Sequence, residues 1–450
     1  MPLRDILIIT AVIAAVPLAF VRPWFGILAW TWLGLMNPHK MTWYAQHLPL
    51  AQAVAISTLA ALLLAPDRKR VPWTREMVIL ALFAVDVTIT TITAWYPEVS
   101  WAQWDKVSKI LLFTFITPML IYGQYRTRWL LLVIVFSLGF FGFKGGLFSI
   151  LTGGHHRVLG PESSFIADNN SLGLALCMVL PLALISARQE HHKYIKWALY
   201  SIFYFSIVAI LFTYSRGAFL GLIALMLAIF WRYKGRIFVI GLLAAVVVFA
   251  AKDFIPSEWY DRQESTLHYK EDNSAMQRIQ AWSVAINIAK ARPLLGAGMS
   301  FDFAGDSATW LSYASFLGDW DNKARAAHSI YLQVLGGLGV PGFSLFILLL
   351  FFTFFRLRSL ARFENHPELS WIGVYARALQ YSLIPYMVSG AFLSLAYFDL
   401  FYMVVALSAI LSRDASAQTA NEVSVVRDKA KPLLSGDNED DRSIDTVRGW

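Results

Sequence analysis

The sequence predicts an all-α polytopic membrane protein with about 12 transmembrane helices. Of its 450 residues, 57% are hydrophobic and 15% are charged, and the mean hydropathy is +0.53. Apolar runs of about 20 residues, the length of a helix that spans a bilayer, recur along the chain. The alternating pattern of an outer-membrane barrel is absent. Helices are therefore the expected spanning elements.

Lys and Arg concentrate in every second connection between the apolar runs, which makes these connections cytoplasmic by the positive-inside rule. The first two runs share the break Arg22-Pro23, so they form two crossings or one crossing and a re-entrant segment. The basic connections are 67–75, 126–128, 188–196, 232–236 and 356–362. The candidate spans lie near 5–21, 24–36, 49–66, 76–93, 107–122, 129–152, 169–187, 197–213, 217–231, 236–251, 329–355, 371–391 and 397–411.

The remaining loops are then extracytoplasmic, and we expect the catalytic or binding residues of the protein to lie in them. They are 37–48, 94–106, 153–168, 215–216, 252–328 and 392–397. We expect four regions: transmembrane helices with short loops (1–251), a cap loop (252–328), C-terminal transmembrane helices (329–411) and a disordered cytoplasmic tail (412–450).

The centre of the cap loop, NSAMQRIQAWSVAINIAKARP, predicts an amphipathic helix. Asn273 or Ser274 is a suitable N-cap, and Pro293 lies beyond the end. The expected apolar stripe is Met276, Ile279, Trp282, Ile286 and Ala289. This helix would lie on or over the membrane domain.

Several function classes lack support in the sequence. A single cysteine, Cys177, excludes an intramolecular disulfide framework and a multi-cysteine metal site. The net charge is +8, and most basic residues lie in short clusters between apolar runs. This distribution indicates membrane topology and not a nucleic-acid-binding surface. P-loop, zinc and Gly-x-Ser-x-Gly patterns are missing. The 37–48 loop has no carboxylate, which favours a mechanism without a metal ion.

The stretch FTYSRGAFLG places an arginine between two long apolar runs. Arg216 lies at the extracytoplasmic end of its helices, where the positive-inside rule does not account for it. One interpretation is a helix end solvated by lipid headgroups. The other is a fixed anion site, because ionisable residues at such depth usually face a cavity or a partner.

A second arginine, Arg278, stands on the expected cap helix beside its apolar stripe. An arginine in this position is also ordinary surface chemistry. It shares the extracytoplasmic side with Arg216, and two guanidiniums can hold the two phosphates of a diphosphate through paired N–H contacts. Together the arginines form a candidate diphosphate site.

The stretch AHSIYLQVLGGLGVPG begins where the cap loop enters the next span. His328 lies at or just before the first helical turn, where the helix dipole disfavours imidazolium and a neutral ring can accept a proton. A histidine N-cap is the alternative. Tyr331 shares the face of His328, and the glycines with Pro341 permit close packing or a kink below it.

The stretch HHRVLGPESSFIADNNSLG adds further candidates. His156 and Arg157 supply positive charge for an anion surface, and Asn170 belongs to a polar group that either caps a helix or contacts substrate. Lys144, inside an apolar run, is close enough to its extracytoplasmic end to snorkel or to join the site. These four residues and Tyr331 are the candidate substrate-binding residues.

Three stretches in order, YSRGAFLG, QRIQAW followed by PLLGAGMSF, and AHSIYLQVLGGLGVPG, resemble the O-antigen ligase and polymerase superfamily of bacterial inner-membrane glycosyltransferases. The similar core runs from about Gly160 to Gly342. The N-terminal third, with RPWFGILAWTWLGLMNPHKMTWYAQHLP, resembles the subgroup described as O-glycosylation ligases associated with polysaccharide export and exosortase systems. The order and spacing of the motifs are more specific than any one of them.

The resemblance implies a GT-C-type fold and transfer of a glycan from undecaprenyl diphosphate to lipid A–core at the periplasmic face of the inner membrane. The family's catalytic positions fall on Arg216, Arg278 and His328. We expect an inverting O-antigen ligase without metal or other cofactor. Its expected partners are the lipid-linked donor, lipid A–core or a glycoprotein acceptor, and membrane lipids, with no nucleic acid.

Other functions stay open at this point. A protein O-oligosaccharyltransferase or an O-antigen polymerase would use the same donor chemistry. A transporter of lipid-linked sugars is the non-enzymatic alternative, although transporters usually contain internal repeats and buried charges near the midplane. This sequence has no convincing repeat, and its candidate charges gather at one face.

Overall fold

The computed structural model describes residues 2–162, 164–232, 273–302, 307–320 and 322–434, and all regular elements in these residues are helices. The helices up to residue 232 are α1 (Leu3–Val21), α2 (Pro23–Met36), η1 (Pro38–Met41), η2 (Ala45–His47), α3 (Leu50–Leu64), α4 (Arg75–Ile92), α5 (Pro97–Leu120), α6 (Gly123–Leu151), α7 (Asn169–Gln189), α8 (Lys193–Leu211) and α9 (Arg216–Arg232). The later helices are α12 (Asn273–Ala291), α13 (Ser307–Ser312), α14 (Ile330–Leu360), η4 (Ala361–Asn365), α15 (Ser370–Ser389), η5 (Gly390–Phe392) and α16 (Asp399–Leu434). The expected span at 236–251 lies outside the described residues.

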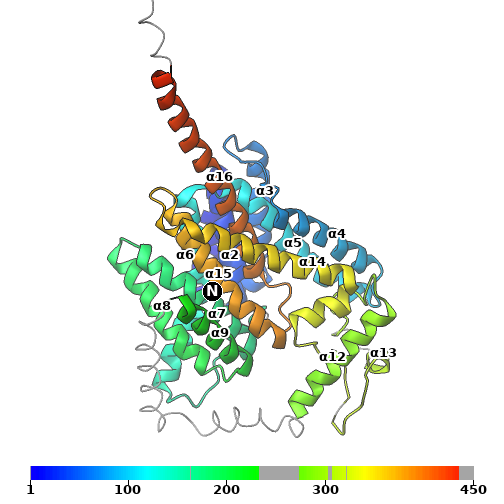
Figure 1. Ribbon diagram of the computed structural model, residues 1–450. Coiled ribbons are helices and arrows are strands. Elements are labelled where there is room, and N and C mark those ends of the chain that lie inside the picture. Colours follow the sequence, from blue (N-terminus) through cyan, green and yellow to red (C-terminus); the bar gives the residue numbers. More distant parts are fainter. Residues whose placement is uncertain (1, 163, 233–272, 303–306, 321, 435–450) are drawn as a thin grey trace, which may run out of the picture.

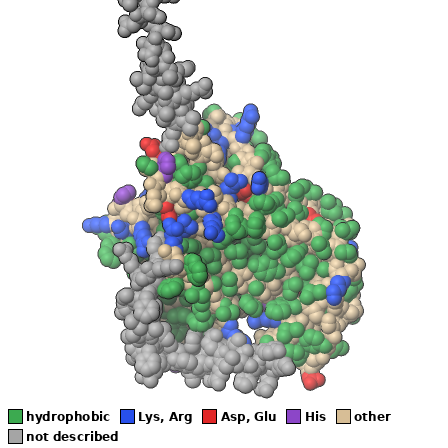
Figure 2. All heavy atoms as spheres, in the orientation of Figure 1, with side chains coloured by type: hydrophobic (Ala, Val, Ile, Leu, Met, Phe, Trp, Pro, Cys, Tyr) green, Lys and Arg blue, Asp and Glu red, His purple; other side chains and the backbone are tan. Residues whose placement is uncertain are grey.

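The protein is a multi-pass membrane protein. Six helices in the described part of the chain are long and apolar enough to cross a bilayer, namely α1, α6, α7, α8, α14 and α16. The apolar helix α2 is shorter: it has 14 residues and reaches about 21 Å, less than the hydrocarbon thickness. Figure 2 shows a broad hydrophobic band across the molecule, with Lys and Arg gathered above it on the face in view.

Glycines of α6 permit a close contact with α8. Gly139, Gly142 and Gly146 recur on one face of α6, and each would clash with α8 if it carried a Cβ atom. At Gly146 that atom would lie 2.2 Å from the carbonyl oxygen of Phe205. Small residues let helix backbones approach where lipid supplies no hydrophobic drive for association. The stretch GFFGFKGG therefore serves packing.

The cap helices α12 and α13 lie at the end of the molecule opposite the projecting C-terminal part of α16 (Figure 1). The chain after α12 is bonded to a kink in α14, where Gly339 has φ 70° and ψ −167°. Backbone hydrogen bonds join Ala297 N to Gly336 O, Gly298 N to Gly337 O and Val340 N to Pro293 O. The two glycine-rich motifs thus fix the cap to the membrane domain.

We expect the variant Gly339→Ala to lose roughly 2–4 kcal/mol of stability. Its positive φ disfavours any L side chain, and the added Cβ would lie 2.6 Å from Pro293 O. Gly123→Ala is the matched control, because Gly123 has φ 68° with no heavy atom within 4 Å of such a Cβ. Thermal unfolding in detergent measures both. Equal losses would contradict a tight junction at Gly339.

The buried face of α12 differs from the expected apolar stripe. Ile286 is 39% exposed, and the buried residues are Gln280, Ala281, Val284, Ala285, Ile288 and Ala289. The backbones of α12 and α14 approach closely here, since a Cβ added to Gly336 would lie 3.1 Å from Ala285. Only small side chains fit at this contact. Close backbone approach, and not hydrophobic size, selects this face.

The region expected to be a disordered tail from residue 412 is instead helical as far as Leu434, as part of α16. Residues 412–434 contain four alanines and four Lys or Arg residues, which favour helix, and this local preference accounts for the difference. Arg413 also anchors the helix, since its Nη2 donates to Ile121 O at 3.0 Å.

Candidate functional site

A polar hollow at the cap end of the membrane domain brings Arg216 and Arg278 together. Its empty volume, including the open mouth, is about 350 Å³. Four elements supply its walls: α7, the turn into α9, α12 and the segment around η5. The lining residues are Asn170, Tyr214, Arg216, Gly217, Ser274, Arg278, Phe392 and Leu393. We call this hollow the arginine pocket.

The turn between α8 and α9 fixes Arg216 as the first residue of α9. Tyr214 adopts a left-handed conformation with φ 56°, which reverses the chain. The buried Ser215 accepts a hydrogen bond from Ala218 N at 3.1 Å through its Oγ, as an N-cap does. Ser389 of α15 donates to Gly217 O at 2.8 Å. These bonds fix the backbone on both sides of Arg216 at the start of α9.

Helix N-termini converge on the arginine pocket. Asp168 caps α7 by accepting from Asn170 N and Ser171 N, and Asn169 Nδ2 donates to Thr213 O at 2.7 Å. The starts of α7 and α9 are therefore joined. Because the N-terminus of a helix carries positive potential, the start of α9 and the guanidiniums favour the same anionic ligand, whereas the Asp168 carboxylate offsets the potential at the start of α7.

Arg278 is held by the packing of α12 within the cap. Gln280 Nε2 donates to Phe316 O at 3.0 Å, and Trp282 Nε1 donates to Ala327 O at 2.9 Å. The ring of Trp282 also lies 6.4 Å from that of Phe392, a pocket residue. These contacts fix the rotation of α12, so that Arg278 lines the pocket.

His328 lies beside the arginine pocket, one residue before the N-cap of α14. Ser329 is the cap, which replaces the alternative of a histidine N-cap. His328 has φ 45°, and its N–H donates to Ser394 Oγ at 2.8 Å. Burial lowers the pKa of His328 below 6.5, Arg278 lowers it further, and Asp168 acts in the opposite direction. Burial and Arg278, and not the helix dipole alone, are therefore the main influences on this imidazole.

Of the five candidate substrate-binding residues, only Asn170 lines the arginine pocket. The hydroxyl of Tyr331 donates to Met387 O at 2.8 Å and so joins α14 to α15. Lys144 is exposed on α6. His156 and Arg157 are exposed in the loop after α6, with the His156 ring 5.9 Å from that of Phe148.

The loop that carries His156 and Arg157 still reaches the pocket through its backbone. Tyr214, a pocket residue, donates from its hydroxyl to Gly154 O at 2.7 Å. The structure therefore places the two side chains near the site but outside its lining.

Sequence reasoning missed the segment before α16, which was expected to be a short extracytoplasmic loop at 392–397. Leu393 and most residues up to Phe398 are buried, and Phe392 and Leu393 line the pocket. Its backbone polar groups are paired: Tyr402 donates to Ala396 O at 3.1 Å, and Ala396 N donates to Gln333 Oε1 at 3.1 Å. The available signal was the stretch FLSLAYF, in which every residue but Ser394 is apolar or aromatic.

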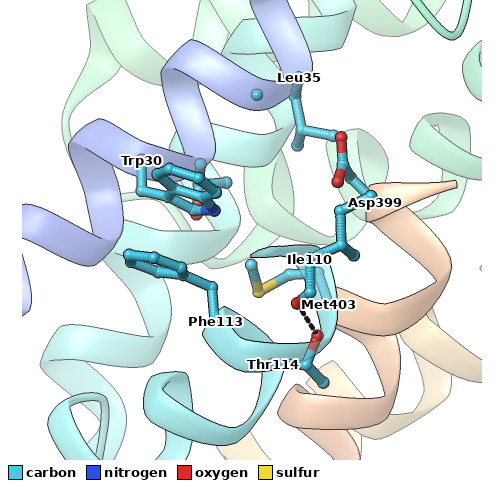
Figure 3. Close-up of a pocket in the computed structure, with 9 residues that line it drawn as sticks. Trp30, Leu35, Ile110, Phe113, Thr114, Asp399 and Met403 are labelled. Atoms are coloured by element: carbon cyan, nitrogen blue, oxygen red, sulfur yellow. Dashed lines mark hydrogen bonds between the residues drawn. The ribbon is translucent and has the colours of Figure 1, made fainter. Parts of the chain in front are cut away.

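A second hollow, of about 330 Å³, lies between α2, α5 and α16 (Figure 3). Trp30 and Phe113 stack at 4.0 Å along one side, and Asp399 supplies its carboxylate. The Thr114 hydroxyl donates to Ile110 O of its own helix at 2.7 Å. None of the candidate site residues lines this hollow, and its chemistry does not suit an anion.

The comparisons with known proteins divide the chain in two. Residues 3–191 match a family of unknown function (DUF5935). Residues 201–347 match the family described as O-antigen ligase. No curated protein matches the chain. The second match contains both pocket arginines and His328, and it confirms the resemblance to the O-antigen ligase superfamily.

Proposed function

We propose that the protein transfers a glycan from undecaprenyl diphosphate to lipid A–core, since residues 201–347 match the family described as O-antigen ligase. The observation that carries the proposal is the pocket that Arg216 and Arg278 both line, with Arg216 at the start of α9. Two guanidiniums match two phosphates in charge and in hydrogen-bond geometry. The ligand class with both features, in a membrane protein of this family, is a lipid diphosphate.

Arg216 and Arg278 hold the donor diphosphate and stabilise the charge that develops on it as the glycosidic C–O bond breaks. The acceptor hydroxyl attacks the anomeric carbon from the opposite side, which inverts its configuration. His328 removes the hydroxyl proton, and the lipid diphosphate leaves with the bonding electron pair. The lowered pKa of His328 supports this role, because only the neutral ring accepts a proton.

The proposed site faces the periplasm of a bacterial inner membrane. The arginine pocket includes α12, at the end opposite the projecting part of α16 (Figure 1). Lys and Arg gather toward that other end (Figure 2), and the positive-inside rule assigns such an end to the cytoplasm. In this proposal the full chain has a GT-C-type fold with about 12 crossings.

An acceptor assay tests the proposed function. Purified protein in proteoliposomes would be incubated with a lipid-linked glycan and lipid A–core, and products would be separated by gel electrophoresis and identified by mass spectrometry. Glycan on lipid A–core is the expected result. Glycan on an added protein acceptor would identify an O-oligosaccharyltransferase, and a lengthened lipid-linked glycan a polymerase. Glycan movement across the vesicle membrane without transfer would contradict the enzymatic proposal.

Transfer is expected to continue in the presence of EDTA. The two guanidiniums supply the positive charge that a divalent cation supplies at other diphosphate sites. The initial rate with EDTA should therefore equal the rate with added Mg²⁺ or Mn²⁺. A rate that collapses on chelation and returns with one of these metals would contradict the metal-independent mechanism.

A further inference from the structure

Asp302 links two parts of the cap that are distant in sequence. It follows the stretch PLLGAGMSF, and only 2% of its surface is exposed. Its Oδ2 accepts a hydrogen bond from Ala327 N at 3.0 Å. Ala327 is the residue before His328, so the carboxylate holds the main chain directly beside the proposed base.

The Ala327–His328 unit is fixed from three sides. Asp302 holds Ala327 N, Trp282 donates to Ala327 O, and Ser394 accepts from His328 N. A left-handed conformation such as φ 45° at His328 is unfavourable for a residue with a side chain. External hydrogen bonds are therefore needed to hold the backbone that directs the imidazole.

Packing alone does not account for a carboxylate at position 302. Its second oxygen, Oδ1, is buried and has no hydrogen-bond partner among the described residues. A buried, half-satisfied carboxylate destabilises a fold relative to an apolar side chain of similar shape. Burial raises the pKa of Asp302 to about 6, which reflects this cost. The hydrogen bond from Ala327 N offsets part of this cost.

We propose that Asp302 is a positioning residue that sets the direction of His328 through the main chain at Ala327. The inference rests on the proposed function, in which His328 receives the acceptor proton. Asp302 does not line the arginine pocket. Its loss should therefore slow the chemical step and leave donor binding largely intact.

Two substitutions separate the hydrogen bond from the charge. Asp302→Leu removes the acceptor, and we expect kcat to fall about 10- to 100-fold because the base is misplaced. The KM for the lipid-linked donor should change less than about threefold, since both arginines remain. Asp302→Asn keeps an acceptor oxygen without the charge, and should restore kcat to within a few-fold of the wild type.

Asp86 of α4 provides the matched control. It also has a buried carboxylate oxygen without a partner in the described part of the chain, but it makes no bond to the Ala327–His328 unit. Asp86→Leu and Asp86→Asn should leave kcat unchanged. If Asp302→Leu does not fold, Asp302→Ala removes the same acceptor with less bulk.

A double-mutant cycle decides whether Asp302 acts through His328. If it does, adding Asp302→Leu to His328→Asn lowers kcat no further. The positioning role would be overturned if the two substitutions together lowered kcat by the product of their separate effects. It would also be overturned by a wild-type kcat in folded Asp302→Leu or Asp302→Ala, or by a kcat of Asp302→Asn as low as that of Asp302→Leu. A wild-type protein that transfers no glycan would instead contradict the proposed function, so the two failures are distinguishable.

Discussion

Replacing Arg216 by alanine is expected to lower glycan transfer about 10²- to 10³-fold, the usual effect of removing one preorganised group that stabilises developing charge. Arg216→Lys should keep the charge but lose the paired N–H contacts, so its rate should lie between those of the wild type and Arg216→Ala. The same series at Arg278 should behave alike. Initial rates with a lipid-linked glycan and lipid A–core measure the effect.

Lys290 is the control for a general loss of positive charge at the cap. It lies on the same helix as Arg278, is exposed and does not line the arginine pocket. Lys290→Ala should therefore transfer glycan at the wild-type rate. Full activity of folded Arg216→Ala or Arg278→Ala would remove the diphosphate assignment.

Loss of the His328 imidazole is expected to lower kcat about 10²- to 10⁴-fold, the range of general base catalysis. Asn is the better replacement than Ala, because Asn tolerates the left-handed backbone that this position requires. The donor KM should stay close to the wild-type value. His156→Asn serves as the control, since that ring is exposed outside the pocket lining.

The pH dependence gives an independent measurement of the same group. Because burial and Arg278 lower the pKa of His328 below 6.5, the wild-type rate should stay flat down to about pH 6.5 and fall at lower pH, as the ring becomes protonated. His328→Asn should lack this acid limb. Normal transfer by His328→Asn would exclude the base role, whatever the shape of the profile.

Composition and periodicity were sufficient for much of the fold. An apolar run long enough to span a bilayer must pair its own backbone N–H and C=O groups, and only a helix does so within one segment. Most expected spans in the described residues accordingly match helices. Helix starts were also readable where polar capping residues precede an apolar run, as at Asp168. The polar composition of the tail suggested disorder, but its helix-forming residues continue α16 to Leu434.

The sequence by itself determined the membrane class, the family resemblance and three residues with suitable chemistry, because hydropathy and side-chain charge are local properties. Tertiary structure alone decided which of them meet. It joined Arg216 and Arg278 with Asn170, and it left Tyr331 and Lys144 outside the pocket lining. It also brought in Phe392 and Leu393. Such convergence depends on helix rotation and on close contacts such as that of Gly336 with Ala285, which involve residues far apart in the chain.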